Sequence, residues 1–432
     1  MKVAVIGNGG REHTIAWSLV RSPEVSHCYC LPGNGGTAGL GKTTNVAIAV
    51  DALEKIGEFC RAEQIDLVVV GPELPLTLGL SDHLQSIGIK VFGPTKAGAE
   101  LEASKSWTKD LLIEAGVPTA FGETFTAPEP AQAYAEKMGA PMVVKADGLA
   151  AGKGVIVAQT LAEAQTAIAD LFEQGFEKIV VEEFLPGEEV SVLALCDGKT
   201  VIPLLPAQDH KRIGEGDRGA NTGGMGAYCQ APLAPPAMIE KIHQQILMPT
   251  AAALAKRGID YRGVLYAGLM ISPTGEIKVL EYNCRFGDPE TQAVLPLLIT
   301  PLETVLMACV EQTLDRLPPL EWHPGSAVCV VVAAGGYPGN YPKGDQITGI
   351  ESAETQGVTV FHAGTELSDG QILTNGGRVL GVTALGNDLP TAIATVYRGI
   401  EQIKFTGMYY RRDIGHRALA APSESSFGGD QS

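Results

Sequence analysis

Short apolar runs alternate with amphipathic stretches over the first hundred residues. The runs at 3–6, 66–70 and 90–92 each end in a turn that contains glycine, and a helical pattern at 11–20 follows the first of them. Strands that alternate with helices are typical of a parallel, doubly wound sheet, whose ligands bind beyond the carboxyl ends of the strands. We therefore expect residues 1–102 to form an α/β domain with its glycine turns at the binding edge.

The rest of the chain has the pattern of α+β units, so we expect a multidomain α/β and α+β protein. Two strands, a helix and a further strand over 122–190 predict a small subdomain. It interrupts a larger domain that comprises residues 103–121 and 191–325. A proline-containing boundary precedes a strand-rich domain at 326–420, and the Ser- and Gly-rich end at 421–432 is expected to be a flexible tail.

Composition narrows the classes of function. The formal net charge of −17 disfavours a nucleic-acid partner, which requires a basic face. No apolar run reaches the length of a membrane span, and a strand rather than a signal peptide opens the chain. The eight cysteines have no CxxC spacing, which predicts neither a zinc site nor a disulfide framework. We expect a cytoplasmic monomer that acts on small molecules and binds neither nucleic acid nor membrane.

Two segments imitate familiar nucleotide-binding motifs. Residues 7–12 resemble a dinucleotide fingerprint but end in Glu12 where Gly or Ala is required. Residues 36–43 match the Walker A pattern, yet the alternating stretch at 44–50 that follows reads as a strand and not as the required helix. We interpret the first segment as a glycine turn that either holds an anion or is purely structural, and the second as a chance match.

A lysine followed by a loop of small residues carries a stronger signal. The segment Lys145-Ala-Asp-Gly-Leu-Ala-Ala-Gly-Lys-Gly-Val155 joins two predicted strands, so it forms a hairpin and not a P-loop. Small residues let backbone amides approach phosphate oxygens closely, and Lys145 and Lys153 add positive charge. A plain flexible hairpin is the alternative interpretation.

Paired acids follow a predicted strand at 179–182. Backbone groups that leave a sheet can bond an adenine edge, Phe184 and Leu185 offer apolar surface, and a later carboxylate can accept both ribose hydroxyls. Taken alone, this segment would more simply be an acidic surface turn. Further along, Glu281 and Asn283 lie two apart on a strand and face the same side, where hard oxygen ligands suit Mg²⁺. Arg285 follows and suits a transferred phosphoryl group.

The order of these segments resembles the ATP-grasp superfamily. Six segments spread over nearly the whole chain resemble, more specifically, the phosphoribosylamine–glycine ligase family; they are residues 7–13, 145–155, 208–212, 221–228, 283–291 and 374–379. The segment Tyr410-Arg-Arg-Asp-Ile-Gly-His-Arg417 is similar to the one that closes members of that family. The Walker-like stretch 37–45 is not a family feature.

This resemblance implies an ATP-grasp fold with an N-terminal doubly wound parallel-sheet domain, a split central domain, an inserted lid and a strand-rich C-terminal domain. It implies that glycine and 5-phospho-β-D-ribosylamine are joined at the expense of ATP, through glycyl phosphate, to give glycinamide ribonucleotide in purine biosynthesis. ATP and Mg²⁺ or Mn²⁺ are the expected cofactors. The absence of a Ser/His/Asp or Cys/His nucleophile set agrees with a reaction that needs charge neutralisation and alignment.

The resemblance also assigns roles to residues. The expected ATP contacts, among which Glu189 is preferred to Glu188 for the ribose, are Lys105, Lys145, Gly152, Lys153, Gly154, Glu182, Glu183, Phe184, Leu185, Glu188, Glu189, Arg212 and Asn221. The expected metal ligands are Glu281 and Asn283. The expected substrate contacts are Gly9, Gly10, Asp209, Lys211, Arg285 and Asp288. The expected catalytic residues are Arg285, Lys145 and Asp209.

Three other functions remain open from the sequence. Another ATP-grasp ligase or carboxylase of nucleotide metabolism would share the nucleotide site. A non-catalytic nucleotide-binding module would have the same fold but an inactive site. A P-loop NTPase or nicotinamide dehydrogenase would bind its ligand at residues 36–43 or 7–12.

Overall fold

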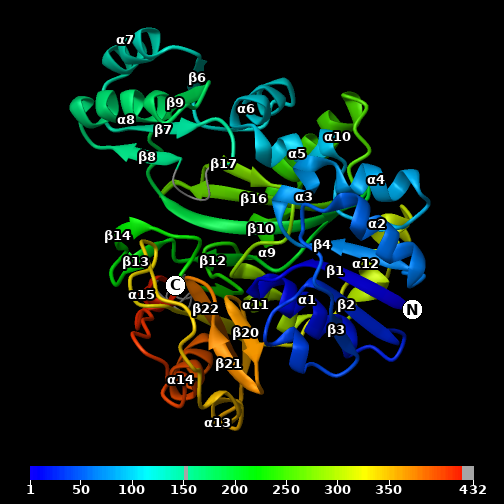
Figure 1. Ribbon diagram of the computed structural model, residues 1–432. Helices are drawn as coiled ribbons and strands as arrows, with labels where there is room; N and C mark the ends of the chain where they lie inside the picture. The colour runs from blue at the N-terminus through cyan, green and yellow to red at the C-terminus, as the bar shows by residue number, and fades with distance from the viewer. Residues whose placement is uncertain (150–153, 421–432) are drawn as a thin grey trace, which may run out of the picture.

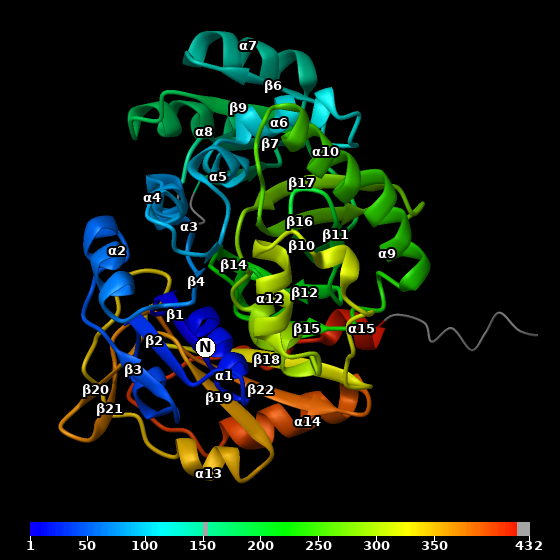
Figure 2. The ribbon, with the colours of Figure 1, turned by 90° about the vertical axis from the view of Figure 1, so that its right-hand side faces the viewer.

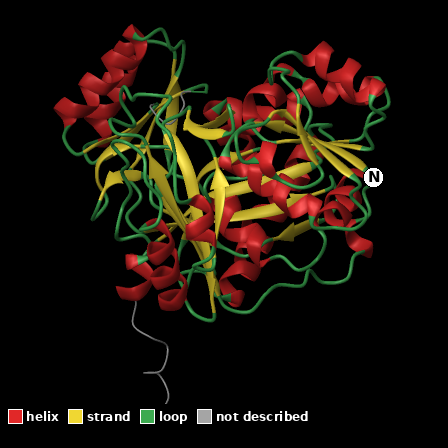
Figure 3. Ribbon diagram, turned by 60° about the horizontal axis from the view of Figure 1, so that its bottom comes forward, coloured by secondary structure: helices red, strands yellow, loops and turns green. Residues whose placement is uncertain are grey.

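The computed structural model describes residues 1–149 and 154–420. Gly152 and Lys153 of the predicted loop, and the tail predicted at 421–432, lie outside the described residues. Strands run through the middle of the molecule with helices on both sides (Figure 3). Within the described residues, no helix combines the length and the hydropathy that crossing a bilayer requires.

A five-stranded parallel sheet forms the N-terminal region, in the strand order β3-β2-β1-β4-β5. Its strands are β1 (Lys2–Gly7), β2 (His27–Pro32), β3 (Thr43–Asn45), β4 (Leu67–Val70) and β5 (Val91–Phe92). Its helices are α1 (Gly10–Val20), α2 (Leu53–Ala62), α3 (Glu73–Leu78) and α4 (Leu80–Ser86). The order reverses between β1 and β4, so the predicted doubly wound sheet is confirmed, and the turns after both strands lie at its switch point.

The two motif-like segments have structural roles in this sheet. The Glu12 carboxylate accepts a hydrogen bond from the Gly9 amide at 2.6 Å and fills the turn after β1. A Cβ atom at Gly7 would lie 2.5 Å from the Glu12 side chain, so glycine is required there. Lys42 turns away from any phosphate site, because its Nζ donates to the carbonyls of Ser22 and Val25, both at 3.0 Å.

The inserted subdomain is a four-stranded antiparallel sheet, ordered β6-β9-β7-β8, with two helices packed on it (Figure 1). Its elements are β6 (Gly122–Phe125), α7 (Pro128–Met138), β7 (Met142–Ala146), β8 (Val155–Ala158), α8 (Leu161–Glu173) and β9 (Ile179–Glu183). Its buried apolar side chains form a cluster separate from the two larger cores. The strand–loop–strand–helix–strand pattern predicted here is confirmed.

A long sheet runs through the centre, in the order β17-β16-β10-β12-β15-β18-β22-β19, with β11 paired to β10. Its strands before residue 300 are β10 (Glu188–Cys196), β11 (Val201–Pro203), β12 (Ala207–Asp209), β15 (Gly226–Cys229), β16 (Gly263–Ile271) and β17 (Ile277–Asn283). A separate ribbon joins β13 (Arg212–Gly214) to β14 (Arg218–Asn221). Apolar side chains fill both faces of the long sheet.

Helices lie on both sides of the long sheet (Figure 2). Ile246 and Leu254 pack with Ala267 in one core, and Val305 packs with Leu195 and Val264 in the other. The helices of this region are α5 (Lys96–Ala103), α6 (Lys105–Glu114), α9 (Pro236–Ile242), α10 (Met248–Lys256), α11 (Glu290–Val294) and α12 (Leu302–Val310).

The last strands extend the same sheet. Strand β18 pairs with β15 on one side, where Val328 lies opposite Tyr228, and with β22 on the other. The remaining elements are β18 (Ser326–Ala333), α13 (Ile350–Glu354), β19 (Val358–His362), β20 (Thr365–Ser368), β21 (Gln371–Thr374), β22 (Arg378–Gly386), α14 (Leu389–Ile400) and α15 (His416–Ala420). The strand-rich C-terminal region is therefore as expected, while its domain limits stay a prediction.

Candidate functional site

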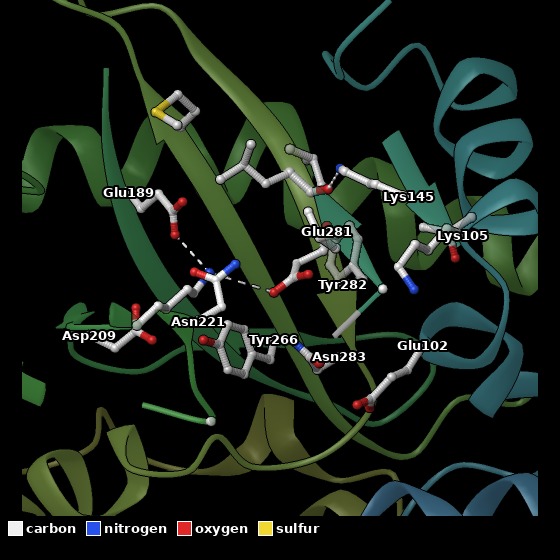
Figure 4. Close-up of a pocket in the computed structure, with 18 of the residues that line it drawn as sticks. Glu102, Lys105, Lys145, Glu189, Asp209, Asn221, Tyr266, Glu281, Tyr282 and Asn283 are labelled. Carbon is white, nitrogen blue, oxygen red and sulfur yellow. Dashed lines mark hydrogen bonds and ion pairs between the residues drawn. The ribbon is translucent and has the colours of Figure 1, made fainter. Parts of the chain in front are cut away.

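A cavity of about 950 Å³ lies between the inserted subdomain, the long sheet and the switch point of the N-terminal sheet. Residues from distant parts of the chain converge on it (Figure 4). Sixteen of the residues predicted for the site line its walls: Lys105, Lys145, Gly154, Glu182, Phe184, Leu185, Glu188, Glu189, Asp209, Lys211, Arg212, Asn221, Glu281, Asn283, Arg285 and Asp288.

Basic and acidic side chains both line the cavity. Nine lysine and arginine side chains line it among the described residues: Arg11, Lys105, Lys109, Lys145, Lys211, Arg212, Arg285, Arg378 and Arg417. Ten aspartate and glutamate side chains line it as well, so the cavity offers cations for an anionic ligand next to carboxylates that suit a metal ion.

One wall holds a buried carboxylate between two lysines. Glu182, at the end of β9, forms ion pairs with Lys145 on β7 and with Lys109 on α6, the latter at 3.0 Å. Lys145 Nζ also donates to the carbonyl oxygen of Leu280 on β17 at 3.0 Å. The Lys145 ammonium therefore bridges the inserted subdomain and the long sheet.

The beginning of the small-residue loop is fixed to the start of α6. Asp147 accepts hydrogen bonds from the Ser106 hydroxyl at 2.6 Å and from the Ser106 amide at 3.1 Å. Lys105 Nζ donates to the Gly148 carbonyl at 3.0 Å. Burial lowers the pKa of Lys105, although the Glu281 carboxylate acts in the opposite direction. Lys105, which the sequence alone could equally place on an exposed helix face, thus points into the cavity.

At the end of β9, successive acidic side chains point to opposite sides, as they do along a strand. Glu182 faces the cavity, whereas Glu183 faces away and accepts from Lys278 Nζ at 2.7 Å and from the Phe121 amide at 2.9 Å. Phe184 and Leu185 line the cavity beyond it. The structure therefore does not bring the Glu183 side chain to the predicted nucleotide wall.

Lys211 lies between two carboxylates of the long sheet, Glu189 on β10 and Glu281 on β17. Its Nζ lies 2.7 Å from Glu189 and 3.7 Å from Glu281. Burial acts to raise the pKa of Glu281, but the positive charges of Lys211, Lys145 and Lys105 outweigh it, so the pKa is lowered. Glu281 is thus held as a carboxylate in the cavity.

Arg285 lies at the junction of β17 and the N-terminal sheet. Its guanidinium donates to Glu102 at 2.7 Å and to the Asn283 side-chain oxygen at 3.2 Å, and it lies 3.4 Å from Glu73. Burial acts to lower the pKa of Arg285, but the Glu102 and Glu73 carboxylates outweigh it and raise the pKa. These contacts place a fixed cation beside the Glu281–Asn283 pair.

Asp209 lies at the end of β12, at the floor of the cavity, and is only 7% exposed. Burial, with the Glu290 and Glu189 carboxylates, raises the pKa of Asp209 to about 7 against the attraction of Lys211 and Arg417. Beside it, the Tyr266 hydroxyl hydrogen-bonds to Glu290 and to the Ser191 hydroxyl. A carboxyl group with such a pKa can take up and release a proton near neutral pH.

Gly9 and Gly10 do not line the cavity. They begin α1 behind Asp288, whose carboxylate accepts from the Arg11 amide at 3.4 Å, and a Cβ atom at Gly10 would lie 2.6 Å from Gln292. Asp288 itself lines the cavity, 3.3 Å from Arg378. Side chains thus cover the first glycine turn, where the sequence predicted substrate contacts.

Several cavity residues were not among those that the sequence predicted. They are Arg11, Glu73, Glu102, Lys109, Tyr266, Glu290, Tyr337, Arg378 and Arg417. Arg11, Glu290, Arg378 and Arg417 belong to segments that carried the family resemblance, which was the available signal. Glu73 follows one of the glycine turns expected at the binding edge, whereas Glu102 gave no local signal, because only the fold brings it to Arg285.

Comparisons with known proteins agree along the chain. Family models described as phosphoribosylglycinamide synthetase match it in three parts: the N domain at residues 1–102, the ATP-grasp (A) domain at 103–291 and the C domain at 327–417. The chain is 84% identical to the phosphoribosylamine–glycine ligase of Synechocystis over 419 residues, which is 97% of this chain and all of that protein.

Solved structures show the same fold. The crystal structure of phosphoribosylamine–glycine ligase from Thermotoga maritima superposes with a TM-score of 0.82 at 34% identity, covering 96% of this chain and 100% of the other. The biotin carboxylase domain of Hydrogenobacter thermophilus 2-oxoglutarate carboxylase superposes with a TM-score of 0.72 at 16% identity, over 94% of this chain and 91% of the other, a likeness of fold alone.

Matches of this length and identity establish the relationship, and the chain belongs to the phosphoribosylglycinamide synthetase family.

Proposed function

We propose that this protein joins glycine to 5-phospho-β-D-ribosylamine with conversion of ATP to ADP and phosphate, which gives glycinamide ribonucleotide in purine biosynthesis. The observation that carries the proposal is the arrangement across one cavity. Lys105 at the start of α6 and Lys145 on β7 line the same cavity as Glu281, Asn283 and Arg285, which lie on β17 and directly after it. Cations that face a carboxylate–amide pair suit a triphosphate held between them.

The nucleotide would bind along the subdomain side of the cavity. Phe184 and Leu185 offer apolar surface to the adenine, and Glu182 offers a carboxylate beside it. Glu189 is the first candidate for the ribose hydroxyls and Glu188 the second. Lys105 and Lys145, with Arg212 and Asn221, would contact the phosphates.

In the first step, a glycine carboxylate oxygen attacks the γ-phosphorus of ATP. A bond forms between that oxygen and phosphorus, and the bond to the β,γ-bridging oxygen breaks, so that ADP leaves with the electron pair. Arg285 stabilises the charge on the transferred group because Glu102 and Glu73 hold its guanidinium in place. The product, glycyl phosphate, is an acyl donor with a good leaving group.

In the second step, the ribosylamine nitrogen attacks the acyl carbon. The new carbon–nitrogen bond forms, the carbon–oxygen bond to phosphate breaks, and inorganic phosphate leaves with the electron pair. The nitrogen loses a proton, which we assign to the Asp209 carboxylate. The pKa of Asp209, about 7, suits this role. Exclusion of water from the cavity would protect glycyl phosphate from hydrolysis.

Glu281 and Asn283 would hold Mg²⁺ or Mn²⁺. Both are hard oxygen donors on one side of β17, and Glu281 is held ionised by neighbouring lysines, so the donor set fits. Among the described residues no group of three His, Cys, Asp or Glu side chains forms a metal cage, so phosphate and water oxygens would complete the shell. When bound, the ion would neutralise phosphate charge.

The test is ADP release by purified protein. Phosphoribosylamine is generated in situ from ribose 5-phosphate and ammonia, and glycine is compared with other amino acids, bicarbonate and formate. We expect ADP and glycinamide ribonucleotide in equal amounts when glycine, phosphoribosylamine and ATP are all present. Activity confined to another acid–amine pair would favour a different ATP-grasp ligase or carboxylase, and binding without turnover would favour a non-catalytic nucleotide-binding module.

We also propose that the protein acts as a cytoplasmic monomer. The cavity residues named in the proposed mechanism lie on one chain, which is the arrangement that a monomeric enzyme requires. Light scattering during size-exclusion chromatography tests this point, and a mass near twice 45.3 kDa would contradict it.

A further inference from the structure

The segment at 409–417 returns from the C-terminal region and packs against the segment that carries Asp209. The Tyr409 hydroxyl donates to the Ile213 carbonyl at 2.8 Å, the Gly216 amide donates to Asp413 at 2.8 Å, and the Gly415 amide donates to His210 Nε2 at 3.0 Å. These bonds span about two hundred positions of sequence, so they join two separate parts of the fold.

Two arginines of this segment share one acid. Arg411, fully buried, lies 2.8 Å from Asp217, and Arg417 lies 2.7 Å from the same carboxylate. Arg417 also donates through Nη1 to the backbone carbonyl of Asp209 at 3.1 Å. Both Asp217 and Arg417 line the cavity. The Arg417 guanidinium therefore connects a fixed acid to the backbone of the proposed proton acceptor.

The Asp209 carboxylate is buried and lines the cavity, while its backbone pairs with Ala227 of β15 and its carbonyl accepts the hydrogen bond from Arg417. Its position is therefore set through its backbone. The charged and titratable groups around it are Lys211 on its own segment, Glu189 on β10, Tyr266 on β16, Glu290 on α11 and Arg417 on α15.

We propose that Arg417 is a positioning residue for the carbon–nitrogen bond-forming step, and that it holds Asp209 through its bonds to the Asp209 carbonyl and to Asp217. This inference rests on the proposed function, because it concerns the residue assigned to accept the amine proton. The Arg417 charge also favours the ionised form of Asp209, since it lowers the pKa of that carboxyl against the effect of burial. Geometry and charge together keep Asp209 ready as a base.

The experiment compares full-length Arg417→Gln and Arg417→Lys with a matched control, Arg412→Gln. Arg412 lies five positions away on the same segment, and its exposed side chain lies over the Tyr410 ring, 5.9 Å from its centre. The control removes the same charge without the bonds to Asp209 and Asp217. Ligase rates are measured from pH 5.5 to 9 with saturating ATP, Mg²⁺, glycine and phosphoribosylamine.

We expect Arg417→Gln to lower kcat by roughly 10- to 100-fold, with the KM for ATP changed less than about twofold, because a misplaced base slows the step without touching the nucleotide. The acid limb of the kcat profile should move up by about half a pH unit, because a nearby positive charge is lost. Arg417→Lys should keep the limb close to the wild-type position while lowering kcat, and Arg412→Gln should match the wild type.

An Arg417→Gln profile that coincides with that of Arg412→Gln would overturn the inference. So would an equal loss of kcat and of thermal stability with an unmoved acid limb, which indicates a general structural role. Hydrogen exchange of the 207–217 backbone supplies a readout that needs no turnover, and we expect faster exchange in Arg417→Gln than in the control. Inactive wild-type protein would refute the proposed function, and exchange rates indistinguishable from those of the control would then still overturn the positioning role.

Discussion

Replacing Glu182 by glutamine removes the negative charge that two buried lysines share. The Lys109, Lys145 and Glu182 side chains are 7%, 10% and 6% exposed, so water cannot replace the lost carboxylate. Removing one partner from a buried ion pair costs about 3–5 kcal/mol, because the remaining charge stays buried without compensation. We expect the free energy of unfolding of Glu182→Gln to fall by roughly that amount.

Glu183→Gln is the matched control, since it places the same substitution one residue further on the same strand. Glu183 and its partner Lys278 are 36% and 32% exposed. A solvent-exposed pair contributes about 0–1 kcal/mol, so the control should lose at most that much. The two variants differ mainly in burial, which is the quantity under test.

The assay is urea unfolding followed by circular dichroism, without nucleotide and with a saturating non-hydrolysable ATP analogue. Triphosphate would supply negative charge to Lys145, so the analogue should stabilise Glu182→Gln more than it stabilises the wild type. If Glu182→Gln lost less than about 1 kcal/mol, like the control, the reasoning from buried charge would be refuted.

Three further predictions follow from the site. Glu281→Gln should lower kcat by roughly 10²- to 10³-fold while calorimetry still detects ATP binding; unchanged kcat would contradict its metal role. Lys42→Ala should keep ligase activity within about twofold and lose about 1 kcal/mol of stability, because its Nζ only bonds two carbonyls; loss of ATP binding would restore the P-loop hypothesis. The wild-type kcat should fall as the pH drops through about 7, because Asp209 must be deprotonated to accept the amine proton. Asp209→Asn should lose most activity and should no longer show this fall at low pH. If the fall persisted in this variant, another group would be responsible for it.

The sequence predicted local elements well where apolar runs are long and bounded by turns. The apolar run at 3–6 lies within β1, and the helix predicted at 11–20 coincides with α1 except for its first residue. The strand predicted at 44–50 was too long, because only Thr43–Asn45 pairs with β2. Alternation over a short stretch does not specify whether a partner strand is present.

Long-range pairing could not be predicted in the same way. Nothing local to residues 326–333 indicates that this strand pairs with β15, about a hundred residues earlier. For the same reason, only part of the site could be predicted from the sequence. Glu281 and Asn283 were found because they lie two apart on one strand, whereas the contact of Glu102 with Arg285 joins residues 183 positions apart. The ligand contacts assigned to these residues stay a prediction.

The pairing of β15 with β18 limits where this protein can be cut into fragments. A fragment that stops before residue 326 would leave the amide and carbonyl groups along β15 open, and would uncover the apolar side chains that β18 and β22 now shield. An exposed, apolar edge strand tends to pair with strands of other chains, which leads to aggregation. Fusion or fragment-complementation designs should therefore cut where the chain enters or leaves the inserted subdomain, which has a hydrophobic core of its own, and should keep the long sheet intact.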